Sequence, residues 1–275
     1  MRIPGWKTLR QSGRWLRSRL TPGALILGYH RVADLQSDPH GLAVSVEHFA
    51  QQLEVLQRLA QPLPLAQLVA HLKAGTLPPR AVALTFDDGY ADVLYQALPL
   101  LERYEIPATL FVVTGCLGEP FWWERGQSEQ ADDPFPPRAM TRTELAQLAA
   151  GGLVDFGAHS VTHPALTERP LYEQRLEIEQ SKAELEAILQ GRIRAFSYPH
   201  GATSDETQRL VRQAGYHYAC ASTPDMVRSA SRLFCLPRFW IGNWDGPRFE
   251  RWLRWWLSAS PLQTPPAPAH WRQQM

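Results

Sequence analysis

The stretch AVALTFDDGY, residues 81–90, joins a predicted buried strand to two adjacent acids. Residues 81–86 form a mostly apolar run of strand length, so Asp87 and Asp88 are expected at its carboxyl end. Neighbouring carboxylates repel each other, and an Asx-type turn with both acids in solvent would need only one of them. The pair therefore marks a candidate functional site.

Strand and helix patterns alternate along the rest of the chain. Residues 24–30 resemble a strand, Ser45 begins a helix, and Thr141 and Glu144 form a capping box for another. Further helices are predicted at residues 65–73, 91–104, 142–150, 172–189 and 205–214, and further strands at 109–114, 154–159, before 198–199, 216–221 and 233–240. This alternation indicates an α/β fold with a parallel sheet or barrel, whose functional groups gather at the carboxyl ends of strands.

The composition fits one domain and argues against nucleic-acid binding and against cysteine-based structural sites. With 275 residues, 44% of them hydrophobic, the chain can bury one sizeable core. A net charge of +1 gives no reason to expect nucleic acid as a partner. Cys116, Cys220 and Cys235 lie far apart, which argues against a disulfide framework or a cysteine-based zinc site.

The sequence shows no obvious membrane span or export signal. No apolar run approaches the ~18 residues of a transmembrane helix. The apolar stretch at residues 24–28 is too short for the core of a signal peptide. We therefore expect a cytoplasmic protein.

A second motif, GAHSVTHPAL, follows another predicted strand. His159 and His163 are one helical turn apart, so both could bind one metal ion from the same face, with a carboxylate completing the site. Alone, this spacing is a weak signal, and structural histidines are the usual explanation. Together with the paired acids it is stronger, because both motifs are expected at the same edge of the sheet.

These two motifs, TFDDGY and HSVTHP, resemble those of the NodB-type polysaccharide deacetylases, carbohydrate esterase family four. The resemblance covers about residues 24–240 and implies a distorted (β/α) barrel that removes N-acetyl groups from amino sugars. It implies that Asp87 is the general base and that Asp88, His159 and His163 hold one divalent metal. Zinc is the first expectation, with iron, cobalt or manganese as alternatives. The division fits the chemistry, because a carboxylate committed to a metal cannot also accept the proton of water.

The third motif departs from the family pattern. Where most members read F-R-x-P-Y-G, this chain has Phe-Ser-Tyr-Pro-His-Gly at residues 196–201. The backbone N–H of His200 can still act as the oxyanion donor, since it does not depend on the side chain. The family's arginine, which orients the base, is missing, and Arg238 is our candidate substitute.

The general acid is expected early in the chain. No late histidine motif follows residue 217, whereas residues 26–32 read ILGYHRV. This resembles the permuted subgroup that includes the poly-N-acetylglucosamine deacetylases, and it implies that His30 protonates the leaving amine. Substrate contacts are predicted for Tyr198, Trp122, Trp123 and Trp240, and the long segment 118–140 for a substrate lid.

The two ends differ from the predicted domain at residues 23–258. Residues 1–22 have the pattern of a basic amphipathic helix, and residues 259–275 that of a disordered tail rich in proline and glutamine. An apolar stripe with arginines beside it, Phe249, Trp252, Leu253, Trp256 and Leu257, precedes that tail. Both helices either pack on the barrel or lie on the cytoplasmic face of an anionic membrane.

The sequence as a whole predicts metal-dependent release of acetate from an N-acetylated amino sugar, in a glycan or a lipid-linked glycan. A deacylase for another N-acyl or an N-formyl group has the same chemistry and stays an alternative. A glycan-binding barrel without activity is less favoured, because all five expected catalytic and metal side chains are present: His30, Asp87, Asp88, His159 and His163.

Overall fold

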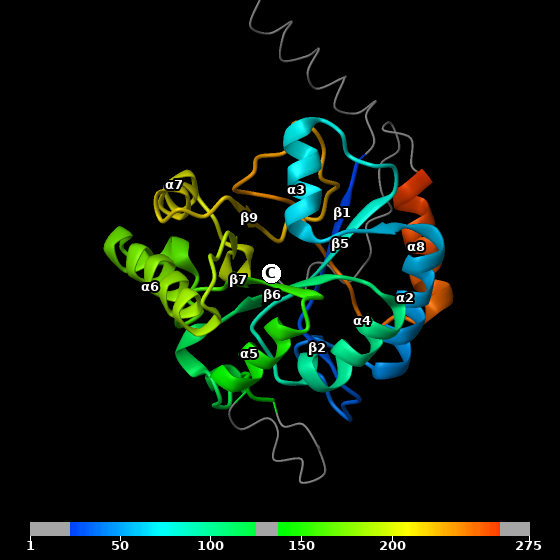
Figure 1. Ribbon diagram of the computed structural model, residues 1–275, viewed down its shortest axis with the longest axis horizontal. Coiled ribbons are helices and arrows are strands. Elements are labelled where there is room, and N and C mark those ends of the chain that lie inside the picture. The colour runs from blue at the N-terminus through cyan, green and yellow to red at the C-terminus, as the bar shows by residue number, and fades with distance from the viewer. Residues whose placement is uncertain (1–22, 125–136, 259–275) are drawn as a thin grey trace, which may run out of the picture.

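The centre of the molecule is a parallel β-sheet surrounded by helices (Figure 1). The computed structural model describes residues 23–124 and 137–258. The strand order is β10-β1-β5-β6-β7-β8-β9, with β4 beside β5, and each of these pairings is parallel. The strands are β1 (Leu25–Tyr29), β4 (Gln61–Pro62), β5 (Ala81–Phe86), β6 (Ala108–Val112), β7 (Val154–Ala158), β8 (Ala195–Ser197), β9 (Tyr218–Cys220) and β10 (Phe239–Trp240). A small second sheet pairs β2 (Arg31–Val32) with β3 (Ala43–Val44).

The helices cover the outside of this sheet. In Figure 1, α2, α4 and α8 lie on one side, α6 and α7 on the other, and α3 and α5 at opposite ends. The α-helices are α2 (Val46–Leu59), α3 (Leu65–Ala74), α4 (Leu98–Tyr104), α5 (Arg142–Ala150), α6 (Leu171–Leu189), α7 (Asp205–Gln213) and α8 (Gly246–Ser258). The short turns are η1 (Val93–Ala97), η2 (Thr114–Cys116), η3 (Trp122–Glu124), η4 (Leu166–Glu168) and η5 (Pro199–Gly201). This arrangement confirms the predicted α/β barrel class.

Alternate residues of the central strands face two different cores. In β5, Val82, Leu84 and Phe86 belong to the large cluster beneath the surrounding helices. Ala81 and Ala83 face a smaller cluster that includes Ile26. Successive side chains of a strand point to opposite faces of the sheet. A strand that is buried on both faces therefore has a continuous apolar sequence.

Local sequence signals set several helix ends. The Ser45 hydroxyl accepts from the His48 N–H at the start of α2, and the predicted Thr141–Glu144 capping box is present at α5. The predicted helix 91–104 instead begins with a π-turn, and α4 starts only at Leu98. Pro99 explains the difference, because it has no N–H to continue the helical hydrogen bonds.

The segment that closes the sheet also differs from its prediction. Residues 233–240 were expected to form one strand, but only β10, Phe239–Trp240, is regular. Leu236 bridges Cys220 of β9, and Phe239 pairs with Leu27 of β1, so the segment links the two edges of the sheet. Pro237 interrupts the ladder because it lacks an N–H.

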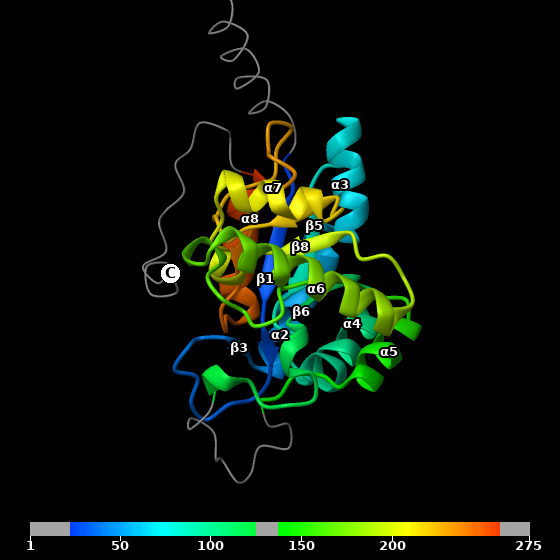
Figure 2. The ribbon, with the colours of Figure 1, turned by 90° about the vertical axis from the view of Figure 1, so that its left-hand side faces the viewer.

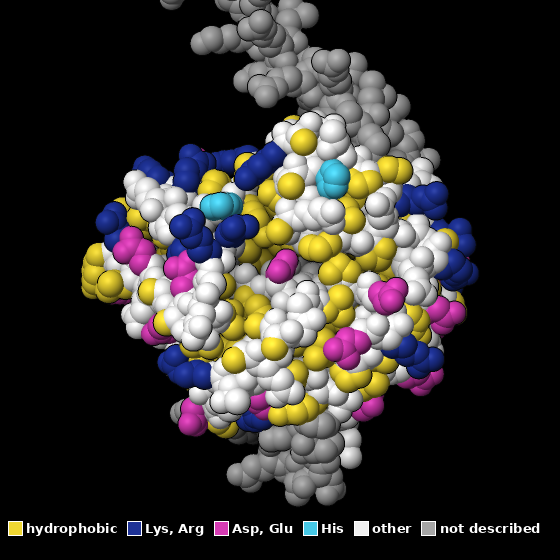
Figure 3. All heavy atoms as spheres, in the orientation of Figure 1, with side chains coloured by type: hydrophobic (Ala, Val, Ile, Leu, Met, Phe, Trp, Pro, Cys, Tyr) yellow, Lys and Arg dark blue, Asp and Glu magenta, His cyan; other side chains and the backbone are white. Residues whose placement is uncertain are grey.

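The apolar stripe of α8 packs on the barrel. Phe249, Leu253 and Trp256 are buried, and the Trp256 ring lies 4.5 Å from that of Phe239. Of the two alternatives, packing on the barrel and lying on a membrane, packing therefore describes the apolar stripe of α8. Lys and Arg side chains gather along the edge of the molecule that α8 occupies (Figure 3). None of the helices within residues 23–124 and 137–258 combines the length and apolar character needed to span a bilayer. The expected helix at 1–22, the tail at 259–275 and much of the expected lid lie outside the described residues.

Candidate active site

The paired acids leave β5 in two different directions. The Asp87 N–H donates to the Tyr29 carbonyl at 2.9 Å, which continues the pairing of β5 with β1. Asp88 then has a φ of 71° and Gly89 a φ of 90°, so the chain turns sharply. Left-handed backbone is uncommon outside glycine and concentrates at functional sites. The turn gives the two neighbouring carboxylates different main partners, while His159 Nε2 lies 3.5 Å from an oxygen of each.

Arg238 forms a two-pronged ion pair with Asp87. Arg238 Nη1 and Nη2 donate to Asp87 Oδ1 and Oδ2 at 2.7 and 2.8 Å, and both side chains are buried. The Ser197 hydroxyl donates to Asp87 Oδ2 at 3.0 Å and accepts from Arg238 Nη2 at 2.8 Å. Burial raises the pKa of Asp87, but the charge and hydrogen bonds of Arg238 outweigh it and hold the pKa well below its ordinary value.

Arg238 thus contacts Asp87, as predicted from the sequence for a substitute for the family's missing arginine. Ser197 occupies the position at which the motif F-R-x-P-Y-G has arginine, and its hydroxyl bridges Asp87 and Arg238. The Arg238 guanidinium also donates to the Ala221 carbonyl and the Thr85 hydroxyl. A buried arginine that uses its fork on one carboxylate fixes the orientation of that carboxylate.

Asp88, His159 and His163 bring three potential ligand atoms within 4.8 Å of one another. Asp88 Oδ1 lies 3.5 Å from His159 Nε2 and 3.4 Å from His163 Nε2. The two histidines do not lie on a helix, although their spacing equals one helical turn. His159 follows β7 directly, and His163 lies in an irregular turn with a φ of 55°.

The donor set fits a divalent cation. The Ser197 carbonyl can only accept a hydrogen bond, so the 2.8 Å contact with His159 Nδ1 places the proton on Nδ1 and leaves a lone pair on Nε2. Burial lowers the pKa of His159 and of His163, which keeps both rings neutral. The ε-nitrogens of two imidazoles and a carboxylate oxygen therefore converge, an arrangement that a metal ion stabilises.

His30 follows β1 and lies against Trp240 at the end of β10. The two rings stack with centroids 4.3 Å apart and an angle of 19°. A Cβ at Gly28 would lie 2.6 Å from the Trp240 ring, so glycine is required for the indole to reach this position. Burial lowers the pKa of His30 to about 4, with the charges of His159 and Arg238 acting in the same direction against that of Asp87.

His200 occupies the turn after β8, with a φ of 56°. The turn is closed by hydrogen bonds from Gly201 and Ala202 to Tyr198 and Pro199, so the His200 N–H is not used in closing it. The imidazole of His200 lies 4.5 Å from that of His163. The side chain of His200 is thus next to the candidate metal cluster.

Of the predicted aromatic residues, Trp123 contacts His163 and Trp122 contacts Trp123. The Trp123 ring lies 4.8 Å from the His163 ring, and its indole N–H donates to the Tyr90 hydroxyl. Trp122 packs edge-on against Trp123 and keeps 40% of its surface exposed. The Trp123 indole therefore lies beside the candidate metal cluster, and Trp122, on the far side of a contact with Trp123, is accessible to a ligand.

Tyr198 does not have the predicted substrate contact. Its side chain is fully buried, and its hydroxyl donates to the Phe234 carbonyl at 2.9 Å. The ring packs against Phe196. Tyr198 is adjacent to the motif in sequence, but strand alternation directs it into the core, so its role is structural.

The structure adds a buried ion pair that the sequence reasoning missed. Arg31 Nε donates to Asp92 Oδ2 at 2.7 Å, and the Val32 N–H donates to Asp92 Oδ1 at 3.3 Å. The Arg31 guanidinium also lies over the Tyr90 ring. The pair ties the chain after His30 to the helical segment after the paired acids. The sequence held a signal for this pair, because Arg31 directly follows His30 and Asp92 is a third acid in the motif DDGYAD.

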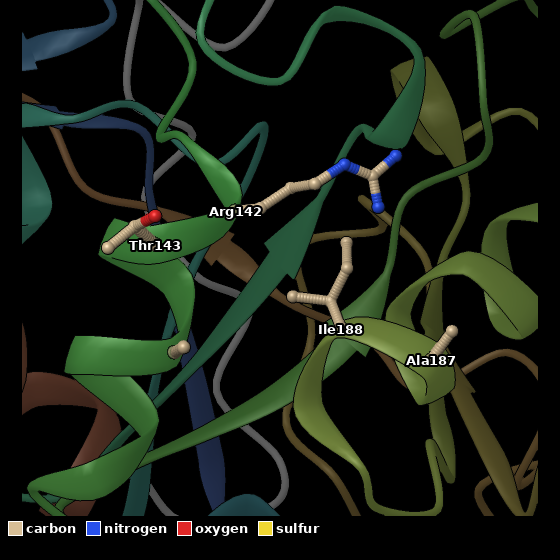
Figure 4. A pocket seen from close by; sticks show the side chains of 5 residues that line it. Arg142, Thr143, Ala187 and Ile188 are labelled. Carbon is tan, nitrogen blue, oxygen red and sulfur yellow. The ribbon is translucent and has the colours of Figure 1, made fainter.

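A separate hollow lies between α5 and α6 (Figure 4). Arg142 and Thr143 line it from α5, and Ala187 and Ile188 from α6. None of its lining residues belongs to the cluster of acids and histidines, so it has no part in the candidate site.

Comparisons with known proteins agree with this geometry. Residues 74–219, which are 146 of the 275 residues, match the family model of polysaccharide deacetylase. The chain is 24% identical over 256 residues to the poly-beta-1,6-N-acetyl-D-glucosamine N-deacetylase of Staphylococcus aureus strain MSSA476, covering 85% of this chain and 82% of that protein. Against the Staphylococcus epidermidis protein of the same name, identity is 24% over 255 residues, with 81% and 83% covered.

Solved structures show the same fold. The Streptococcus pyogenes deacetylase PplD, in complex with acetate, has a TM-score of 0.70 at 25% identity, with 85% of this chain and 99% of that chain covered. IcaB from Ammonifex degensii has a TM-score of 0.71 at 24% identity, with 85% and 97% covered. The sequence resemblance is confirmed, and because the family model matches more than half of its residues, this chain belongs to the polysaccharide deacetylase family.

Proposed function

We propose that this chain hydrolyses the N-acetyl group of an N-acetylglucosamine-type residue in a glycan, releasing acetate and leaving a free amine. One observation carries the proposal. The buried Asp87–Arg238 pair, the cluster of Asp88, His159 and His163, and His30 all converge at the carboxyl ends of neighbouring parallel strands. The named Staphylococcus relatives act on poly-beta-1,6-N-acetyl-D-glucosamine, which supports a polymer of this sugar as the substrate class.

Asp88, His159 and His163 would hold the metal ion. When bound there, a divalent cation polarises the amide carbonyl and lowers the pKa of the attacking water towards ~7. We propose zinc, because two imidazoles and one carboxylate are a common zinc donor set, while iron, cobalt and manganese accept the same ligands.

Asp87 accepts the proton of the attacking water. Its depressed pKa keeps it ionised at neutral pH, and Arg238 fixes its plane. Among the hydrogen bonds of the described residues, Oδ2 accepts two and Oδ1 accepts one, so Oδ1 retains a lone pair for the proton. The His200 N–H donates to the carbonyl oxygen as negative charge develops on it.

His30 delivers a proton to the leaving amine. With a pKa of about 4 its ring is neutral at pH 7, so it first takes up a proton, balanced by the one that Asp87 removes from the attacking water, and then gives it to the leaving amine. Stacking on Trp240 fixes the plane of the ring and therefore the direction of Nε2 and Nδ1. Trp240 contacts both His30 and Arg238, which makes it a positioning residue, while Trp122 and Trp123 offer apolar faces to the sugar.

Acetate release by the purified, zinc-loaded protein tests the proposal. Poly-β-1,6-N-acetylglucosamine oligomers, soluble N-acetylglucosamine compounds and lipid-linked N-acetylglucosamine are compared, each with and without a chelator, with the Asp87→Asn variant as control. Chelator-sensitive release that is lost in the variant supports the proposal. Release of formate or a longer acid from the corresponding N-acyl analogues, without acetate release, would assign the other deacylase function.

The location of the protein stays a prediction. A cytoplasmic enzyme on the membrane surface would meet lipid-linked sugars, and the segment expected to contact the membrane, residues 1–22, lies outside the described residues. Preference for the lipid-linked substrate in the same assay supports that prediction.

A further inference from the structure

The turn between the two candidate metal-binding histidines has an unfavourable backbone. Ser160 and His163 have φ values of 64° and 55°, in the left-handed region. Residues other than glycine held in this region strain the backbone. Only Ser160, Val161 and Thr162 separate the histidines, so such a turn persists only where surrounding groups hold it.

One side of the turn is held by the segment after β6. The Thr114 N–H donates to the Ser160 carbonyl at 3.2 Å, and the Gly115 N–H donates to the Val161 carbonyl at 2.9 Å. A Cβ on Gly115 would lie 2.5 Å from the Val161 carbonyl oxygen, so this approach requires glycine. These contacts satisfy two carbonyl groups of the turn but none of its N–H groups.

The N–H groups on the other side point to Glu177 of α6, the helix that faces the viewer in Figure 2. Glu177 Oε2 accepts from the Val161 and Thr162 N–H groups at 2.8 Å each, and Oε1 accepts from the Thr162 hydroxyl at 2.6 Å. The remaining N–H, that of His163, donates to the Ser160 hydroxyl at 3.0 Å. One carboxylate therefore receives three hydrogen bonds from the two residues at the centre of the turn.

We propose that Glu177 is a positioning residue that holds the turn in its metal-binding conformation before the metal ion arrives. The inference rests on the proposed metal site and assigns a residue that supports it. Hydrogen bonds to an ionised carboxylate are about twice as strong as neutral ones, which offsets the backbone strain at Ser160 and His163. Groups that orient metal ligands typically change metal affinity about 10- to 100-fold when they are removed.

The test compares zinc affinity and amide exchange in the full-length protein. In Glu177→Ala the turn loses all three acceptors, so zinc affinity, measured by competition with a chromogenic chelator, should fall about 10- to 100-fold. In metal-free protein, hydrogen exchange of the Val161 and Thr162 amides should accelerate. Glu177→Gln should largely restore both, because the amide oxygen can accept the two N–H groups while the amide nitrogen donates to the Thr162 hydroxyl.

Two further variants separate this role from general effects on the helix. Glu179→Ala removes an exposed glutamate two residues away and should bind zinc as the wild type does. Thr162→Val removes one contact from an exposed position and should weaken zinc binding only a few-fold, about the effect of one hydrogen bond. If Glu177→Ala does not fold, Thr162→Val and Glu177→Gln still provide the measurement.

The inference is overturned if Glu177→Ala binds zinc within two-fold of the wild type and its amides exchange at the wild-type rate. It is also overturned if Glu177→Gln is as impaired as Glu177→Ala, or if the wild type has no zinc affinity. Neither readout uses a substrate. A result that supports Glu177 alongside a failure to release acetate would therefore locate the error in the proposed substrate and not in the turn.

Discussion

Asp87 and Asp88 are neighbours in sequence and both are buried, yet their surroundings are opposite in character. Asp87 is surrounded by hydrogen-bond donors, since Arg238 and Ser197 supply three bonds to its two oxygens. Asp88 faces the ε-nitrogens of His159 and His163 at 3.5 and 3.4 Å, and the same His159 Nε2 lies 3.5 Å from Asp87 Oδ2. Asp87 is paired with the guanidinium of Arg238, whereas Asp88 belongs to the group of candidate metal ligands.

The difference shows how one turn supports two chemical tasks. A carboxylate paired with arginine keeps its orientation and is ionised when the reaction begins, so it can accept a proton in each cycle. A carboxylate among neutral imidazoles has the ligand chemistry of a metal site. The positive φ of Asp88 marks the sharp turn between the two carboxylates, and His159 Nε2 lies 3.5 Å from an oxygen of each.

Exchanging each acid for its amide should separate the two tasks, with the largest expected effect. Asp87→Asn should lower kcat for acetate release by about 10²- to 10⁴-fold, because the general base is lost, and should still bind zinc. Asp88→Asn should lose zinc. Metal content by mass spectrometry, thermal melting and acetate release are measured together for both variants.

The comparison between the two acids is wrong if Asp87→Asn loses zinc while Asp88→Asn retains it. Melting curves serve as the control, because a variant that is unfolded at the assay temperature says nothing about either task.

Removing Arg238, the cation paired with Asp87, should greatly lower the stability of the fold. Arg238→Met leaves Asp87 buried without a partner, and breaking a buried pair in this way typically costs about 3–5 kcal/mol of unfolding free energy. Arg238→Lys keeps the charge but not the fork, so its loss should be smaller. Urea denaturation measures both, and equal stability of all three proteins would show that the pair does not stabilise the fold.

Displacing the stack under His30 should have an intermediate effect on turnover. The Cβ in Gly28→Ala would lie 2.6 Å from the Trp240 ring and push the indole from its place against His30. We expect kcat to fall about 10- to 100-fold, as for a misplaced catalytic group. Zinc affinity should be unchanged, since the ligands come from other strands. Wild-type turnover would mean that Trp240 does not position His30.

A second carboxylate–arginine pair, outside the site, tests how much burial matters. Arg138 donates to both oxygens of Glu144 at 2.7 Å, and the Arg138 side chain is 28% exposed. Arg138 lowers the pKa of Glu144 to about 2, against the opposing effect of burial and with further help from Thr141 and Tyr95. Because the folded-state pKa lies below the ordinary 4.5, the stabilisation is present above pH 4.5 and is lost as the pH falls towards 2.

This pair should therefore have the smallest effect of the series. Between pH 5 and pH 2.5, wild type should lose about 1–2 kcal/mol more unfolding free energy than Glu144→Gln, after allowance for solvent screening. Urea denaturation across that pH range measures the difference. Parallel pH profiles for the two proteins would show that the pair contributes nothing to acid stability.

The sequence predicted the chemistry of the site more completely than its surroundings. Asp87, Asp88, His159 and His30 each directly follow a strand, and the carboxyl ends of parallel strands share one edge of a sheet. Their convergence could therefore be inferred from local pattern. The spacing of His159 and His163 did not define the backbone between them, because one helical turn and an irregular turn with positive φ span the same number of residues.

Residues that act through distant contacts could be predicted only in part. Arg238 was a candidate because an expected arginine was missing, but its fork on Asp87, 151 residues away in sequence, depends on how the segment before β10 closes the sheet. Tyr198 carried the signal of a motif residue, and its burial follows from the face of β8 on which it lies. Glu177 looked like one of several solvent-facing charges on its helix.

The sequence by itself thus determined the α/β class and identified the candidate ligands and candidate acid–base groups, because strand periodicity and side-chain chemistry are local properties. The tertiary structure alone decided that Glu177 reaches the turn between the histidines, that Arg31 pairs with Asp92, and that α8 packs on the barrel. Each of these depends on the packing of segments far apart in sequence, where the position of a whole helix or loop decides which side chains meet.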